Sequence, residues 1–197
     1  MPFFLFDCRL PFQRPLRTVR RTAHGFTLLE VMIVVAIMGV LAAIAAPSFT
    51  PTIERWRVRD AAESLISTLY YARSEAIKRG GNVHIKVASG TDWNSGWSVF
   101  HDANGNNTQD TCDTTKTPNE CTLRVAAALP QVTITLDETD GTLVVDRWGV
   151  ITNKSEPIME FELAPKGGDS SNASARKLCL SGGGGIKQKK GSEACTS

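Results

Sequence analysis

The sequence predicts an α+β fold in which one long N-terminal helix packs on antiparallel β-sheets. An unbroken apolar run comes first, and an amphipathic helical period follows it directly. Two glycines end that period, and the rest of the chain alternates apolar and polar residues between turn signals. Because no further amphipathic helix separates the expected strands, we expect the strands to be antiparallel. The chain is predicted to divide into four segments. Residues 1–25 form a leader, residues 26–46 the apolar half of the helix, residues 47–80 its amphipathic continuation, and residues 81–197 a β-rich globular head.

The first half of the helix is apolar enough to span a membrane. Residues 26–46 contain a single charged side chain, that of Glu30. As a helix these residues extend about 32 Å, which is enough to cross a bilayer core of about 30 Å.

Charge is distributed unevenly along the 197 residues. The net charge is +4 for residues 1–25, −6 for residues 26–165 and +4 for residues 166–197. A basic segment before an apolar span stays in the cytoplasm, so we expect residues 47–197 to lie outside it. A secretory signal cleaved near Ala43-Ile44-Ala45 is the alternative. However, the run is longer than the usual signal, and that interpretation gives Glu30 no purpose.

The second half of the helix is amphipathic. Its apolar residues recur at the i, i+3, i+4 spacing of one helix face. They are Val58, Ala61, Ala62, Leu65, Ile66, Leu69, Ala72, Ala76 and Ile77. Pro47 can bend the helix without ending it. Gly80-Gly81 is a C-cap signal, so the predicted helix runs from about residue 27 to residue 79.

The remaining chain is predicted to form strands. The alternating stretches are residues 82–89, 96–102, 131–137, 142–149, 158–164 and 176–181. Asn104-Gly105-Asn106-Asn107 and Thr139-Asp140-Gly141 are turn signals between them.

The start of the apolar run resembles a known signal. Gly25-Phe26-Thr27-Leu28-Leu29-Glu30, preceded by a basic leader, resembles the signal of type IV pilins and type II secretion pseudopilins. The resemblance implies that a membrane peptidase cleaves after Gly25 and N-methylates the new amine of Phe26. It also implies that the helix stays in the membrane until the subunit enters a filament. The leader is longer than in most members of that family.

Glu30 then has an expected role in assembly. An ionised carboxylate in hydrocarbon costs about 2.5–3.5 kcal/mol or more, so such a group normally has a partner. Cleavage would create one, the ammonium group of Phe26 in a neighbouring subunit. The alternative is that Glu30 lies near the interface and reaches water.

The chain after the anchor resembles the minor-pilin group that includes FimT, FimU and the pseudopilin GspH. The resemblance rests on residues 59–80, on GWSVFHDANGN, on Gly149 in RWGV and on a strand pair around residues 179–189. It implies a non-catalytic subunit that primes or caps pilus assembly, with other minor pilins, the major pilin, the prepilin peptidase and the inner-membrane assembly platform as partners. The expected location is the bacterial inner membrane, with the head in the periplasm, and then the pilus. A type II secretion pseudopilin and a DNA-binding minor pilin of natural transformation are the alternatives.

The cysteines predict two disulfides. Cys8 leaves with the leader, and Cys112, Cys121, Cys179 and Cys195 remain outside the cytoplasm. Three connectivities are possible, and the pairing of sequence neighbours, Cys112–Cys121 and Cys179–Cys195, is the simplest. Each bridge stabilises by about 2–4 kcal/mol.

Lysines near the C-terminus are candidate DNA contacts. Lys187, Lys189 and Lys190 follow four glycines, in what we expect to be a loop closed by a disulfide. Such a loop can present ammonium groups to phosphates. The resembling DNA-binding proteins carry a Gly-Arg-x-Arg motif here, whereas this chain has Gly184-Gly185-Ile186-Lys187. Lysine lacks the bidentate geometry of arginine, and a solvated loop is the simpler interpretation.

Other candidate sites are weaker. Asp102, Asn104, Asn106, Asp110 and Asp113 approach a calcium loop, but Gly105 comes two positions early and no closing Glu follows. We therefore expect a turn, with no metal and no cofactor. His84 and His101 are expected in strands, and no motif suggests a catalytic triad, so no enzyme activity is predicted. Trp93, Trp97 and Trp148 are expected to be sheet or core aromatics.

Overall fold

The computed structural model describes residues 25–115, 119–137, 140–153, 159–182 and 184–195. The leader therefore lies outside the described residues, apart from Gly25. The chain divides into two compact units, residues 1–44 and 45–197. One helix, α1 (Leu28–Arg79), begins in the first unit and ends in the second.

The described part of the first unit is the apolar half of α1. Leu28–Ala45 is long and apolar enough to cross a membrane, and none of this span is buried against the other residues that the structure describes. Large side chains such as Leu28, Val35 and Leu41 are more than 60% exposed. A segment that buries none of these groups by itself requires lipid or other helices around it.

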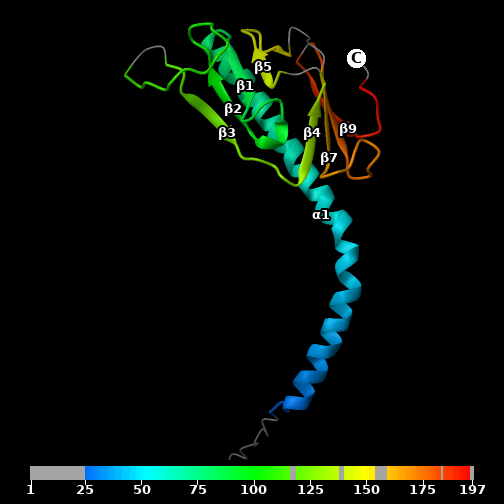
Figure 1. Ribbon diagram of the computed structural model, residues 1–197. Coiled ribbons are helices and arrows are strands. Elements are labelled where there is room, and N and C mark those ends of the chain that lie inside the picture. Colours follow the sequence, from blue (N-terminus) through cyan, green and yellow to red (C-terminus); the bar gives the residue numbers. More distant parts are fainter. Residues whose placement is uncertain (1–24, 116–118, 138–139, 154–158, 183, 196–197) are drawn as a thin grey trace, which may run out of the picture. The chain divides into compact units, whose positions relative to one another are not determined.

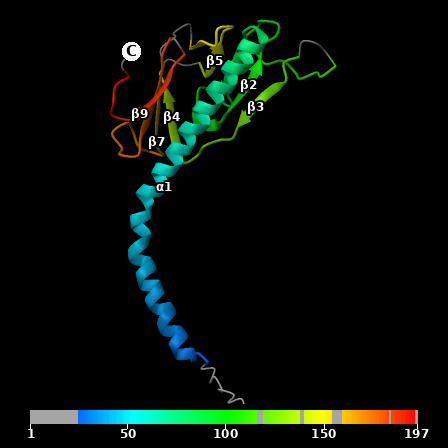
Figure 2. The ribbon, with the colours of Figure 1, turned by 180° about the vertical axis from the view of Figure 1, so that it is seen from behind.

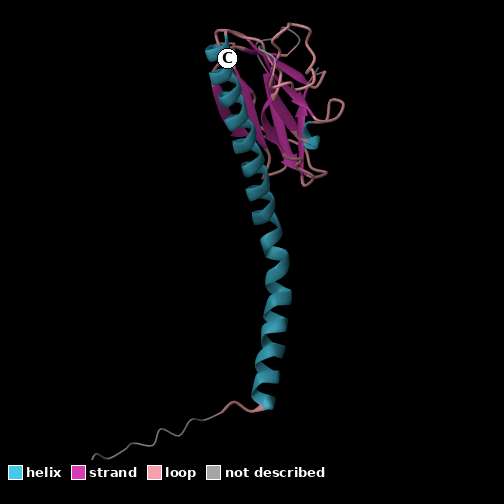
Figure 3. Cartoon of the chain, turned by 90° about the vertical axis from the view of Figure 1, so that its left-hand side faces the viewer, coloured by secondary structure: helices cyan, strands magenta, loops and turns pink. Residues whose placement is uncertain are grey.

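The second unit contains two antiparallel sheets that pack on the rest of α1 (Figure 1). The first sheet has the order β3 (Thr122–Ala126), β2 (Trp97–His101), β1 (Val83–Val87), β5 (Thr142–Val145) and β6 (Ile151–Thr152). The second has the order β4 (Val132–Leu136), β7 (Met159–Pro165), β8 (Arg176–Leu180) and β9 (Ile186–Lys190). A short 3₁₀ helix, η1 (Trp93–Ser95), precedes β2. The strands lie to one side of this part of the helix (Figure 3).

The buried face of α1 follows the predicted period except at Ile77, which was expected on that face and is 58% exposed. Its fully buried residues are Val58, Ala61, Ala62, Leu65, Thr68, Leu69, Ala72 and Ala76. The alanines allow close approach of the sheets, while each buried leucine contributes about 1.5–3 kcal/mol. Thr68 is the polar exception, because its hydroxyl accepts a hydrogen bond from the Trp97 indole N–H at 3.2 Å.

Aromatic side chains join the two sheets in the core. Trp93 and Trp97 are each 1% exposed, which confirms that both are core aromatics. The Trp93 ring meets Phe161 of β7 edge to face, with centroids 5.0 Å apart, and lies 6.0 Å from the Trp97 ring of β2. η1 thus places one indole between a strand of each sheet.

The helix ends as its glycines predict. Gly80 and Gly81 have φ angles of +87° and +111°, and both N–H groups donate to the carbonyl oxygen of Ala76. The Asn104–Asn107 stretch is likewise a turn, between β2 and β3.

Three parts of the strand prediction are wrong. The stretch 142–149 ends as a strand at Val145, because the Asp146 carboxylate accepts the N–H groups of Trp148 and Val150, both at 2.8 Å. Trp148 is consequently 77% exposed on a turn, and it is not a core aromatic. The short strands β3 and β6, at the edges of the first sheet, were not anticipated.

Gly96 provides a test of the packing at the start of β2. Its φ is +86°, and a Cβ there would lie 2.5 Å from the carbonyl oxygen of Ala126. We expect Gly96→Ala to lower the free energy of unfolding by about 1–3 kcal/mol more than Gly167→Ala, because overpacking against backbone is costly. Gly167 is the matched control, since its φ is +77° and a Cβ there meets nothing within 4 Å. Urea unfolding of the detergent-solubilised chain, followed by tryptophan fluorescence, measures both. Equal losses would contradict the role of the Ala126 contact.

Candidate functional site

The expected cleavage junction is exposed and unobstructed. Gly25 and Phe26 precede the first turn of α1, and Phe26 is 83% exposed. A Cβ at Gly25 would meet no atom within 4 Å. Among the described residues, no contact therefore requires glycine at this position.

Glu30 lies in the first turn of α1, where Thr27 caps the helix. The Glu30 backbone N–H donates to the Thr27 hydroxyl oxygen at 3.2 Å. This is half of a capping box, a local signal that our sequence analysis missed. A carboxylate at a helix N-terminus gains about 0.3–1 kcal/mol from the helix dipole. That gain is smaller than the cost of a charge in hydrocarbon, so a further cation is still needed in the membrane.

The C-terminal lysines lie on a strand, as the expected strand pair around residues 179–189 predicts, inside the covalent loop that the Cys179–Cys195 disulfide closes. Lys187, Lys189 and Lys190 belong to β9, an edge strand that pairs with β8. Side chains alternate across a strand. Lys187 is paired with Cys179 and Lys189 with Lys177, on the face that carries the Glu160–Lys177 ion pair of 3.3 Å. Lys190 is paired with Arg176, on the opposite face.

A groove on the helix side of β9 gathers charges that sequence reasoning did not connect. It holds about 430 Å³ and is lined by Arg59, Glu63, Arg176, Gln188, Lys189, Lys190 and Glu193. Strand alternation leaves three of the cationic side chains, Arg59, Arg176 and Lys190, on the helix side of β9, beside the carboxylates of Glu63 and Glu193. Arg59 and Glu63 form an exposed ion pair at 2.8 Å, and the Lys189 ammonium group donates to the Ala194 carbonyl oxygen at 2.7 Å. Lys189 therefore helps to fix the C-terminal segment.

The disulfides join sequence neighbours. Cys112 is bonded to Cys121, and Cys179 of β8 is bonded to Cys195. The first closes the excursion between β2 and β3. The second holds the C-terminal segment against the face of the second sheet that carries Lys187.

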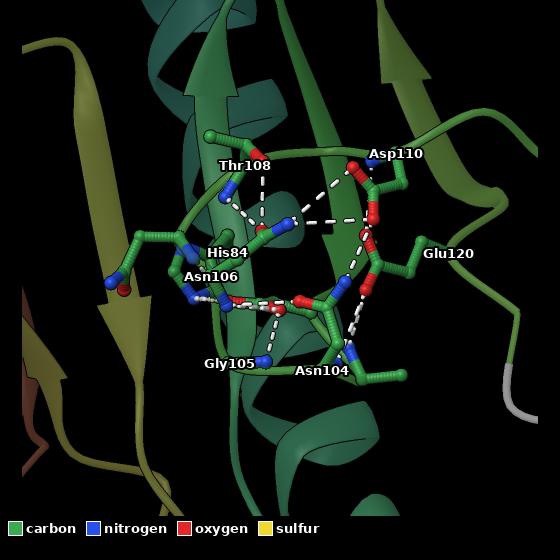
Figure 4. Close-up of polar contacts among 10 residues, drawn as sticks. His84, Asn104, Gly105, Asn106, Thr108, Asp110 and Glu120 are labelled. Atoms are coloured by element: carbon green, nitrogen blue, oxygen red, sulfur yellow. Dashed lines mark hydrogen bonds and ion pairs between the residues drawn. The ribbon is translucent and has the colours of Figure 1, made fainter.

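The acidic loop after β2 is organised around two buried carboxylates (Figure 4). Asp102, which is 1% exposed, accepts the backbone N–H groups of Gly105, Asn106 and Asn107. Glu120, which is 5% exposed, accepts those of Ala103, Asn104 and Asp110. Both carboxylates thus serve the loop as turn-stabilising acceptors. Among the described residues, no three His, Cys, Asp or Glu side chains are grouped to hold a metal ion.

His84 lies beneath this loop, in β1, and is almost completely buried. Its ring stacks on Phe100 with centroids 5.3 Å apart, and its Nε2 is 3.6 Å from an Asp102 oxygen. Its Nδ1 has no hydrogen-bond partner among the described residues. Burial lowers the pKa of His84, although the charges of Asp102 and Glu120 oppose the shift. The imidazole is therefore held neutral at pH 7.

The fold and the exposed N-terminal junction define a membrane-anchored, pilin-like subunit. Residues 20–46 match the prokaryotic N-terminal methylation motif, and residues 61–184 match the family model described as type II transport protein GspH. The chain belongs to this GspH family, in which minor pilins and pseudopilins resemble one another.

The chain is also similar in sequence to two individual pilin-like proteins and in fold to a third. The chain is 38% identical over 89 residues to pilin-like protein PilA1 of Thermus thermophilus, covering 45% of this chain and 54% of the relative. It is 36% identical over 75 residues to type II secretion system protein H of Xanthomonas campestris pv. campestris, covering 36% and 44%. The chain thus spans about half the length of the curated relatives it matches. Its fold matches that of the type IV minor pilin FimU of Pseudomonas aeruginosa with a TM-score of 0.51 and 22% identity, covering 73% of this chain and 96% of FimU.

The neutral His84 predicts a pH dependence of stability. An unfolded histidine titrates near pH 6.5, and the folded pKa is lower. Stability is therefore fully present above about pH 6.5 and falls as the pH drops toward the folded pKa, since the unfolded state binds the extra proton. We expect His84→Gln to flatten the fall in unfolding free energy between about pH 7 and pH 5. Denaturant titrations across this range test it.

His101 is the control for this experiment. Burial also lowers its pKa, but the side chain is only half-buried. His101→Gln should keep most of the slope. If the unfolding free energy of His84→Gln depended on pH as steeply as that of the unmutated chain, His84 would not be the group responsible.

Proposed function

We propose that this protein is a minor pilin, a structural subunit that primes or caps a type IV pilus after cleavage between Gly25 and Phe26. The observation that carries the proposal is the joining of three features in one chain. These are an exposed Gly25-Phe26 junction, an apolar half of α1 that is not buried against the other described residues, and a head of the GspH family that contains two disulfides.

The anchor and the head together support this role. The apolar half of α1 requires lipid before assembly and other helices after it. The expected partners are other minor pilins, the major pilin, the prepilin peptidase and the inner-membrane platform. The two disulfides fit a head in the oxidising periplasm. A type II secretion pseudopilin shares all of these features, and detection in sheared pili distinguishes the pilus from it.

Glu30→Gln should be processed normally and fail to assemble. The side chain keeps its size, and the Thr27 cap persists because it binds the backbone N–H of residue 30. Only the counter-charge for the Phe26 amine is lost. The intact mass should still correspond to residues 26–197, with one methyl group added. The amount in the sheared filament fraction should fall at least tenfold, the factor that corresponds to about 1.4 kcal/mol.

Thr27→Ala is the matched control for this prediction. It weakens the helix cap by about 1 kcal/mol but leaves the carboxylate in place, so filament incorporation should persist. Wild-type incorporation of Glu30→Gln would show that the charge pair does not drive assembly. A mature protein that begins near residue 46 would refute the pilin function itself.

DNA binding is the second candidate function, and the groove between α1 and β9 favours it. Arg59, Arg176 and Lys190 line the groove, whereas Lys187 lies on the other face. Contacts of this kind to phosphates would be independent of base sequence and sensitive to salt. The acidic middle of the chain opposes a duplex, so the affinity should be low.

A gel shift at several salt concentrations tests this second function. We expect Arg176→Gln with Lys190→Gln to weaken binding and to reduce the salt slope by about 1.5–2, because two phosphate contacts are lost. Lys187→Gln should change the salt slope by less than about 0.9, the amount that corresponds to one phosphate contact. An equal effect of Lys187→Gln would move the contacts to the opposite face, and no shift at high micromolar protein would remove this function.

A further inference from the structure

The part of α1 that enters the head carries a tryptophan between two arginines. Figure 2 shows the helix continuing beyond the lower end of the sheets. Trp56 is 66% exposed, and its sequence neighbours Arg55 and Arg57 are exposed as well. Consecutive positions of a helix lie about 100° apart, so the two arginines flank the indole around the helix. We call Arg55, Trp56 and Arg57 the collar.

The collar shares its exposed face with apolar residues that lead back to the membrane-length span. Phe49 and Ile53 precede Trp56 by seven and three residues, so all three lie on one face of the helix. All three are exposed. The Ser48 hydroxyl donates to the Ala45 carbonyl oxygen at 2.7 Å, so this polar group needs no water. The exposed face is thus continuous with the apolar span, which favours lipid as its cover.

The length of the uncharged stretch matches the collar to the surface of a bilayer. No charged residue stands between Glu30 and Glu54. These 23 residues extend about 34 Å as a helix, slightly more than the bilayer core of about 30 Å. The headgroup layers add about 5–8 Å on each side, and Arg55 and Trp56 follow within the next turn. Side chains on a helix lean toward its N-terminus, which here is the direction of the bilayer.

The chemistry of the collar indicates a phosphate on a lipid. Arg57 Nη1 donates to the Gln131 side chain at 3.4 Å, which uses one of its five N–H donors. Glu54 offsets one arginine, so residues 54–57 carry a net charge of +1. A guanidinium group binds phosphate oxygens through two parallel hydrogen bonds, and tryptophan is typical of the layer between acyl chains and headgroups. A free phosphate offers the first contact but not the second.

We propose that the collar binds a phospholipid headgroup on the side of the membrane where the head lies, and so fixes how far α1 emerges from the bilayer. Arg55 and Arg57 bind the phosphate, and Trp56 lies at its boundary with the acyl chains. The proposal rests on the membrane-anchored stage of the function proposed above and adds a lipid site to it. It makes no use of contacts between subunits.

Tryptophan quenching in vesicles that contain the full chain tests the position of the collar. The lipid is phosphatidylcholine brominated near the headgroup end of its acyl chains, because bromine quenches only nearby indoles. We expect most of the quenching to disappear in Trp56→Phe and to persist in Trp148→Phe. Trp148 is the matched control, since it is 77% exposed on a turn of the head. Equal losses in the two variants would overturn the proposal.

A second measurement tests the phosphate contact. In one lipid mixture, quenching of Trp56 by brominated phosphatidylglycerol is compared with quenching by brominated phosphatidylcholine. We expect about a fivefold preference for the anionic lipid, the factor for one net positive charge near its surface. Arg55→Gln with Arg57→Gln should abolish the preference. Lys78→Gln with Arg147→Gln removes the same charge at the C-terminal end of α1, where Lys78 lies in the last turn, and should retain it.

The remaining outcomes separate lipid from the other occupants. Equal preferences in the two double variants would overturn the phosphate contact. Reversal of the quenching by excess inorganic phosphate would identify a site for free anions, and quenching that appears only on dilution of the chain in lipid would identify another copy as the cover. Either result overturns the proposal. A chain that does not insert into vesicles would refute the anchor and the proposed function, whereas insertion without quenching of Trp56 would refute the collar alone.

Discussion

The fold of the head depends on one contact, the burial of a single face of α1 against both sheets. No pairing between the described strands joins the two sheets. They are joined by the helix, by the aromatic pair Trp93–Phe161, and by the hydrogen bond of 2.7 Å from the Ile134 N–H of β4 to the Asn94 side chain of η1. Alanines at positions 61, 62, 72 and 76 are small enough for strands of both sheets to approach, and the Trp97–Thr68 hydrogen bond fixes the helix against β2.

The same helix also explains why the anchor and the head are parts of one molecule. In the amphipathic half of α1, each turn buries one face against the sheets and exposes the other to solvent. In the apolar half, neither face is buried against the described part of the head. A helix of this kind gains its remaining burial only from outside the chain, which the proposed function would supply as lipid and then as other subunits. Glu30 fits this view, since the local cap and the helix dipole offset only part of the cost of its charge.

The sequence predicted the parts of the fold that depend on period and capping. The bounds of α1, the glycine cap and six strands follow from local pattern. Trp148 was misplaced because the Asp146 side chain ends β5 by taking two N–H groups, and an Asx turn leaves no trace in hydropathy. The strand pair that holds the lysines was predicted, but the face that each lysine takes was not, because β9 is an edge strand whose single apolar residue, Ile186, gives no alternation. The groove was missed because Arg59 and Arg176 are 117 positions apart and meet only through the packing of α1 on the second sheet.

The face of β9 that each lysine takes determines which charges gather on each side of the head. Strand alternation separates Lys187 from Lys190, and the hydrogen bond from Lys189 to Ala194 uses one lysine to hold the chain terminus. The basic tail is therefore partly structural, and its remaining cations face the groove with Arg59.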